Sequence, residues 1–178
     1  MKRTSTILIF IALLTLVSFK SSWVKNIEIL TEKIKKESIL VDQFEDITSK
    51  DRYMKMELLK SGKYKLLKTE YFNRTTMQTK TEFYLRDSVF LEYKCSGLES
   101  RFDTKSNSFY SIVFEDLYYF KNNQHGIVKE KEIRIGSFKE SNKARIRLKD
   151  KEFKTRELTE EDVIKLQGEY NSLNLLLK

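Results

Sequence analysis

YKLLKTEYF (Tyr64–Phe72), TMQTKTEFYL (Thr76–Leu85) and SVFLEYKC (Ser88–Cys95) are three consecutive stretches that decide the fold. All three are rich in Thr, Tyr, Phe or Val, which favour β-strands. Only Arg86 and Asp87 separate the second stretch, which ends at Leu85, from the third, which begins at Ser88. Neighbouring strands joined by so short a connection are antiparallel. These stretches therefore predict a β-meander.

The strand-like pattern continues on both sides of these stretches. It begins near Asp51, where apolar and charged residues alternate, and reaches about Ile135. Ser108–Phe120 predicts a further strand or pair of strands, and a polar turn separates it from a strand over Ile127–Ile135. We expect a curved antiparallel sheet of five to seven strands.

A helix precedes the sheet. Trp23, Ile27, Leu30 and Ile34 recur at spacings of four, three and four residues, with charged residues between them. This spacing predicts an amphipathic helix that ends near Glu37 or Ser38, and its apolar stripe needs a surface to cover. We expect this helix to cross one face of the sheet.

A second helix is predicted at the other end of the chain. Thr159 is a suitable N-cap, and the acidic residues Glu160, Glu161 and Asp162 follow it in the first turn. We expect this C-terminal helix to close an edge or end of the sheet. The fold class is therefore α+β, and a closed barrel is the structural alternative.

The first residues have the pattern of a secretory signal peptide. Lys2 and Arg3 precede the apolar run Ile7–Val17, which is short for a membrane span. We expect cleavage between Ser18 and Ser22, which leads to export to the periplasm or the extracellular space. An uncleaved anchor is the alternative. No cysteine lies directly behind the apolar run, so a lipoprotein is not expected.

Composition predicts a signal peptide over residues 1–22 and one domain over residues 23–178. The chain has no proline and five glycines, which leaves no Pro- or Gly-rich linker. Its net charge is +8, and loss of Lys2 and Arg3 would lower it to +6. Acidic and basic residues are interleaved, which is typical of a solvated surface rather than a nucleic-acid footprint. The expected partners are a protein, a glycan or an envelope component.

The order of these parts resembles a group of uncharacterised exported bacterial proteins. The resemblance covers about Trp23 to Ile135 and rests on this pattern and on the hairpin around Leu117 to Asn123. It implies a helix packed across a curved antiparallel sheet, and it carries no activity that could be transferred to this chain.

No catalytic, cofactor or metal site is expected. His125 is the single histidine and lies in a polar turn, so neither a zinc site nor a nucleophile–base pair can be built around it. Cys95 is the single cysteine, which rules out an intramolecular disulfide. It is in register with the apolar residues of its strand, which favours a buried structural thiol.

Two acidic residues interrupt the most apolar segment. Glu115 and Asp116 are adjacent in a predicted strand, so they point to opposite faces and one of them is a candidate buried acid with a raised pKa. The alternative is a bulge or strand end that exposes both.

The best candidate binding surface is a basic stretch near the end of the chain. Apolar residues alternate with its charges, which predicts a strand with a basic outer face that an anion or partner would neutralise. The alternative is an edge strand that lysines protect from aggregation. The basic residues are Lys143, Arg145, Arg147, Lys149 and Lys151.

These observations favour an exported, non-enzymatic binding or interaction protein. One alternative is a carrier that holds a lipid or another apolar ligand in a helix-covered groove of the sheet. A second is a hydrolase that acts through paired carboxylates, which abundant acidic residues leave open.

Overall fold

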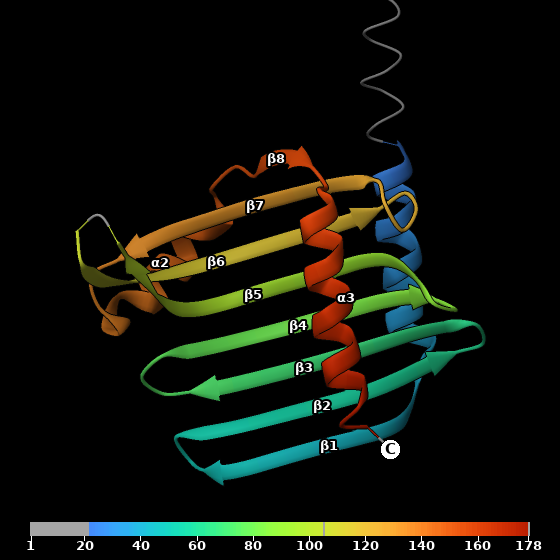
Figure 1. Cartoon of the computed structure of the whole chain (residues 1–178), viewed down its shortest axis with the longest axis horizontal. Coiled ribbons are helices and arrows are strands. Elements are labelled where there is room, and N and C mark those ends of the chain that lie inside the picture. The colour runs from blue at the N-terminus through green and yellow to red at the C-terminus, as the bar shows by residue number, and fades with distance from the viewer. Residues whose placement is uncertain (1–21, 105, 178) are drawn as a thin grey trace, which may run out of the picture.

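An eight-stranded antiparallel sheet is the frame of the computed structural model, which describes residues 22–104 and 106–177. The strands lie side by side in chain order, from β1 at one edge to β8 at the other (Figure 1). The sheet is therefore an open meander, and both the closed barrel and the count of five to seven strands are wrong. The strands are β1 (Ile39–Ser49), β2 (Arg52–Ser61), β3 (Tyr64–Asn73), β4 (Met77–Arg86), β5 (Val89–Asp103), β6 (Ser108–Phe120), β7 (Gly126–Ile135) and β8 (Lys154–Glu157).

The sequence patterns predict β2 to β7 but miss the two edge strands. In β1 the pairing register shifts between Leu40 and Asp42 and again between Ile47 and Ser49. Such bulges break the alternation that identifies a strand. β8 has only four residues, all of them exposed, so it has no apolar face to detect.

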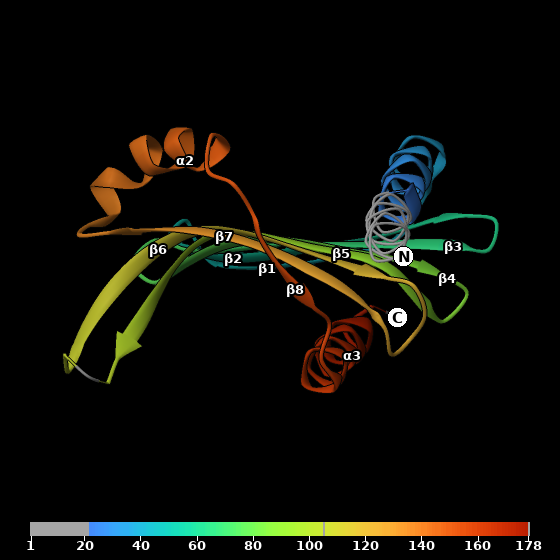
Figure 2. The same ribbon diagram turned by 90° about the horizontal axis from the view of Figure 1, so that it is seen from above.

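The N-terminal helix spans residues 22–37 and crosses one face of the sheet, as the sequence predicts (Figure 2). Ile34 is buried in a cluster with Leu66 and Tyr84 of the sheet, and Leu30 packs against the same cluster. Hydrogen bonds add to this packing. The Tyr119 hydroxyl donates to Glu28 at 2.7 Å, so the helix is held by apolar burial and by polar contacts at its rim.

A buried acid lies beneath this helix. Glu92 of β5 is fully buried, and its carboxylate is 3.2 Å from the ammonium group of Lys94. Burial raises the pKa of Glu92, and the Lys94 charge opposes that shift.

Helix α3 (Glu160–Asn174) covers the opposite face of the sheet rather than an edge or end (Figure 2). Val163 and Leu166 are buried there in one cluster with Phe83 and Phe90. The expectation that the C-terminal helix closes an edge or end is wrong. The central strands carry apolar side chains on both faces of the sheet, so each face needs a helix to cover it. The helix begins as predicted, with a capping box at Thr159.

The stretch predicted as a basic strand is helix α2 (Ser141–Lys149), which follows the short 3-10 helix η1 (Phe138–Glu140). Ala144 and Leu148, one helical turn apart, are buried against the sheet, whereas Ile146 is 65% exposed. Apart from Ile146, the residues from Lys143 to Lys149 are strong helix formers, and they outweigh the apparent period of two. α2 lies on the same face as the N-terminal helix (Figure 2).

Candidate functional site at the β7 edge

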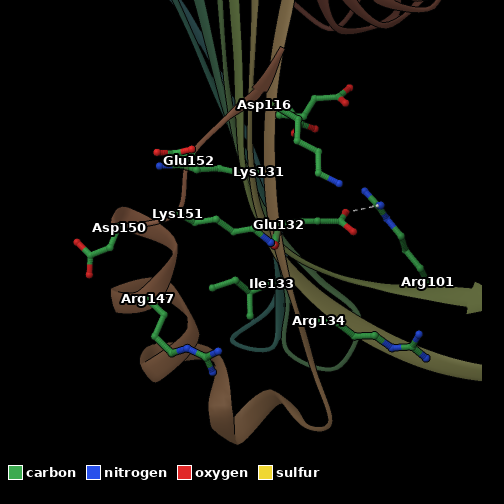
Figure 3. A pocket seen from close by; sticks show the side chains of 12 residues that line it. Arg101, Asp116, Lys131, Glu132, Ile133, Arg134, Arg147, Asp150, Lys151 and Glu152 are labelled. Atoms are coloured by element: carbon green, nitrogen blue, oxygen red, sulfur yellow. Dashed lines mark hydrogen bonds and ion pairs between the residues drawn. The ribbon is translucent and has the colours of Figure 1, made fainter. Parts of the chain in front are cut away.

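A groove of about 920 Å³ wraps around the outer edge of β7 (Figure 3). It forms because β8 pairs with β7 only over Ile127–Glu130, after which the connection to α2 leaves the edge. Its volume is in the range of ligand sites, about 300–1,000 Å³. Its lining is almost entirely charged and consists of Arg101, Asp116, Glu130, Lys131, Glu132, Ile133, Arg134, Arg147, Asp150, Lys151, Glu152 and Lys154.

The outward backbone groups of β7 are only partly paired along this groove. The carbonyl of Gly126 accepts a hydrogen bond from the Leu158 amide at 3.1 Å, and the carbonyl of Glu132 accepts one from the Lys151 ammonium at 2.6 Å. Even-numbered residues therefore direct their backbone groups away from β6, because backbone direction alternates along a strand. The backbone amide and carbonyl of Arg134, the next even-numbered residue after Glu132, therefore also point away from β6. Within the described residues, no strand pairs with β7 on this side beyond Glu130.

Charged side chains are fixed on the α3 side of this edge. Arg101 of β5 donates to Glu99 at 2.5 Å and to Glu132 at 3.0 Å. The guanidinium of Arg134 lies 4.0 Å from the centre of the Tyr110 ring, within cation–π range. The groove thus presents ordered charges of both signs beside an open backbone.

Of the two candidate buried acids, Asp116 is the one that lines this groove, and it is half-buried there. It lies within β6, directly opposite Glu130 of β7 and without a register shift, so the alternative of a bulge or strand end is wrong. Burial and, second, the charge of Glu130 raise the pKa of Asp116 to about 7. Glu130 itself accepts a hydrogen bond from Arg156 at 2.9 Å. The two neighbouring carboxyl groups therefore have different environments: Glu130 is paired with Arg156, whereas burial and the Glu130 charge dominate at Asp116.

Glu115 lies on the other face of the sheet, as alternation in a strand requires. Its carboxylate is 3.0 Å from the ammonium group of Lys131, which also lies over the Phe153 ring at 4.3 Å from its centre. Glu115 is therefore a surface partner of Lys131, and it is not among the residues that line the groove.

The structure divides the predicted basic surface. Arg147 and Lys151 are four residues apart and reach the groove, whereas Lys143, Arg145 and Lys149 are exposed elsewhere on α2. A helix distributes alternate residues around its axis, so the five charges do not share one face. The edge-protection alternative does not apply, since the stretch is not a strand.

The other residues considered for chemistry are isolated. His125 is exposed in the β6–β7 turn, with its Nδ1 atom 3.1 Å from the Asn122 side-chain oxygen. Burial raises the pKa of the Cys95 thiol to about 12, which leaves little reactive thiolate.

In the part of the chain that the structure describes, no group of three His, Cys, Asp or Glu residues could hold a metal ion. None of the described helices is long and apolar enough to cross a bilayer.

Sequence reasoning missed the β7 side of the groove. The run Lys129–Glu132 places charged residues on both faces of a predicted strand, a pattern typical of an edge strand. That pattern could have indicated the open edge. The contribution of Arg101 depends on long-range pairing and has no local sequence pattern.

Comparison with protein families, with curated proteins and with solved structures finds no match to this chain.

Proposed function

We propose that this chain is an exported, non-enzymatic binding protein that recognises an extended segment of another protein in the groove at the β7 edge. The edge of β7 beyond Glu130 carries the proposal, because no described strand pairs with it. An added strand would supply the missing backbone hydrogen bonds and would replace the Lys151 ammonium at the Glu132 carbonyl. The flanking charges of both signs would select the side chains of that segment. Export rests on the N-terminal sequence pattern alone.

Photo-crosslinking tests this proposal directly. A photoreactive amino acid is placed at Glu152, which lines the groove, and a matched one at Glu161, which is exposed on α3. We expect a discrete protein adduct in the producing cells from position 152 and none from position 161. Equal adducts from both positions, or none from either, would overturn the proposal.

Two variants of Arg134 separate backbone pairing from charge. Arg134→Pro removes an amide that faces the groove, and a proline is tolerated at such an edge position. Arg134→Ala removes the guanidinium and its contact with Tyr110 but keeps the amide. Strand pairing predicts that the proline variant loses the adduct while the alanine variant keeps part of it. Equal loss in both variants would assign recognition to charge alone and contradict strand pairing.

One observation favours carboxylate-dependent hydrolysis as a second candidate function. Asp116 and Glu130 lie directly opposite in the groove, where burial raises the pKa of Asp116 to about 7 and Glu130 accepts a hydrogen bond from Arg156. Such pairs supply the acid and the base or nucleophile of glycosidases. Release of new reducing ends from envelope glycans, abolished in Asp116→Asn, would support hydrolysis and contradict a non-enzymatic role.

The carrier alternative has less support. Its requirement is an unfilled apolar groove beneath a helix, but Ile34 of the N-terminal helix and Val163 and Leu166 of α3 are themselves buried in clusters with side chains of the sheet. A lipid that co-purifies at one-to-one occupancy in native mass spectrometry would restore this alternative.

A further inference from the structure

The opposite edge of the sheet is formed by β1, and no strand of the described residues pairs with its outer side. β1 has eleven residues and pairs only with β2 in the described part of the chain (Figure 1). Natural edge strands are usually protected by charged residues, above all lysine, by proline, by bulges or by a covering element. β1 has acidic residues and a bulge near each end, and its pairing with β2 is regular from Asp42 to Ile47. β1 contains neither lysine nor proline, and its Ile39 and Ile47 side chains are 71% and 62% exposed.

The charge of β1 is opposite to that of the chain. It carries Asp42, Glu45 and Asp46 and no basic residue, whereas the whole chain has a net charge of +8. Glu45 is paired with Lys55 of β2 at 3.2 Å. The hydrogen bonds to the carboxylates of Asp42 and Asp46 come from neutral groups, the Gln43 amide and the Thr48 hydroxyl. Two carboxylates at this edge are thus bonded to neutral donors of their own strand.

The β1 edge fits an extended polypeptide with basic side chains. From Asp42 to Ile47, between its two register shifts, its backbone donors and acceptors have the spacing of a β-ladder, which only another extended polypeptide matches. A second copy of β1 would place acidic residues beside acidic residues, and like charges in neighbouring strands are destabilising. Lysine or arginine beside Asp42 and Asp46 would be favourable instead.

We propose that β1 is a second docking edge, which adds an extended, basic and apolar segment of another protein to the sheet. This inference does not depend on the groove at β7, which lies at the other end of the sheet. With both edges occupied, the molecule would join two segments through one continuous sheet.

A synthetic peptide of about ten residues, with lysine alternating with valine, tests this inference. Hydrogen exchange of the full-length protein is compared with and without the peptide. We expect protection of the β1 amides, and binding at least about tenfold weaker for the analogue with glutamate in place of lysine. Absence of β1 protection, or equal binding of both peptides, would overturn the assignment.

Charge-matched variants complete the experiment. Asp42→Asn/Asp46→Asn removes two charges from β1, and Glu160→Gln/Glu161→Gln removes two exposed charges from α3. We expect about fivefold to tenfold weaker binding for the first pair and less than about twofold for the second. Equal losses would indicate non-specific attraction. A dimer in sedimentation that protects β1 without peptide would replace the basic partner by a second copy and overturn the inference.

Discussion

Replacing Asp116 by asparagine is expected to stabilise the protein at high pH and to have little effect at low pH. Because burial raises the pKa of Asp116 from 3.8 to about 7, ionisation costs more in the folded than in the unfolded state. The unfolded protein therefore loses its proton first as the pH rises. The contribution of Asp116 to stability therefore falls from about pH 4, and its loss is complete above about pH 7, whereas asparagine has no such dependence.

The size of the effect follows from the shift. One pKa unit corresponds to about 1.4 kcal/mol, so about three units would give roughly 4 kcal/mol for a fully desolvated group. Asp116 is only partly buried and faces an open groove, so solvent screening reduces the expected difference to about 1–2 kcal/mol at pH 8.

Urea unfolding of the wild type and Asp116→Asn at pH 4 and pH 8 measures this difference. We expect the advantage of the variant to be near zero at pH 4 and to grow with pH. Glu115→Gln, one residue away on the other face, is the control, because it removes the ion pair with Lys131 and should not stabilise. An advantage of Asp116→Asn that is independent of pH, or a loss of stability at pH 8, would refute the reasoning.

Three further substitutions test the packing. Leu148→Ala should cost about 2–3 kcal/mol and Ile146→Ala less than about 0.5 kcal/mol in urea unfolding, because only Leu148 is buried; equal costs would contradict the helical register of α2. Leu166→Ala should cost about 3 kcal/mol, and a cost below about 1 kcal/mol would contradict docking of α3 on the sheet. Tyr119→Phe should cost about 1 kcal/mol through loss of the hydrogen bond to Glu28, and an unchanged unfolding midpoint would show that this bond adds nothing.

The strands and helices with a clear period were predictable from the sequence. β6 (Ser108–Phe120) has the predicted bounds, and the helix after Thr159 begins where its capping residues indicate. The basic stretch has the pattern of a strand, since Ala144, Ile146 and Leu148 alternate with charges, and this prediction is wrong. The same sequence is equally compatible with a helix that buries Ala144 and Leu148 and exposes Ile146.

The candidate site was less predictable than the fold. The adjacency of Glu115 and Asp116 in a strand predicts that only one of them is buried, and Asp116 has the raised pKa. The groove itself depends on where the short strand β8 stops and on how α2 returns to the sheet. Those features are set by long-range packing, for which Arg147 and Lys151 give no local pattern.

Residue-resolved hydrogen exchange at β7 tests the central claim, that this edge is open and available to an added strand. In the protein alone, we predict rapid exchange of the Arg134 amide, which faces the groove, and slow exchange of the Ile133 amide, which faces β6. The captured partner should then protect Arg134. An Arg134 amide that exchanges as slowly as that of Ile133 in the protein alone would contradict the account.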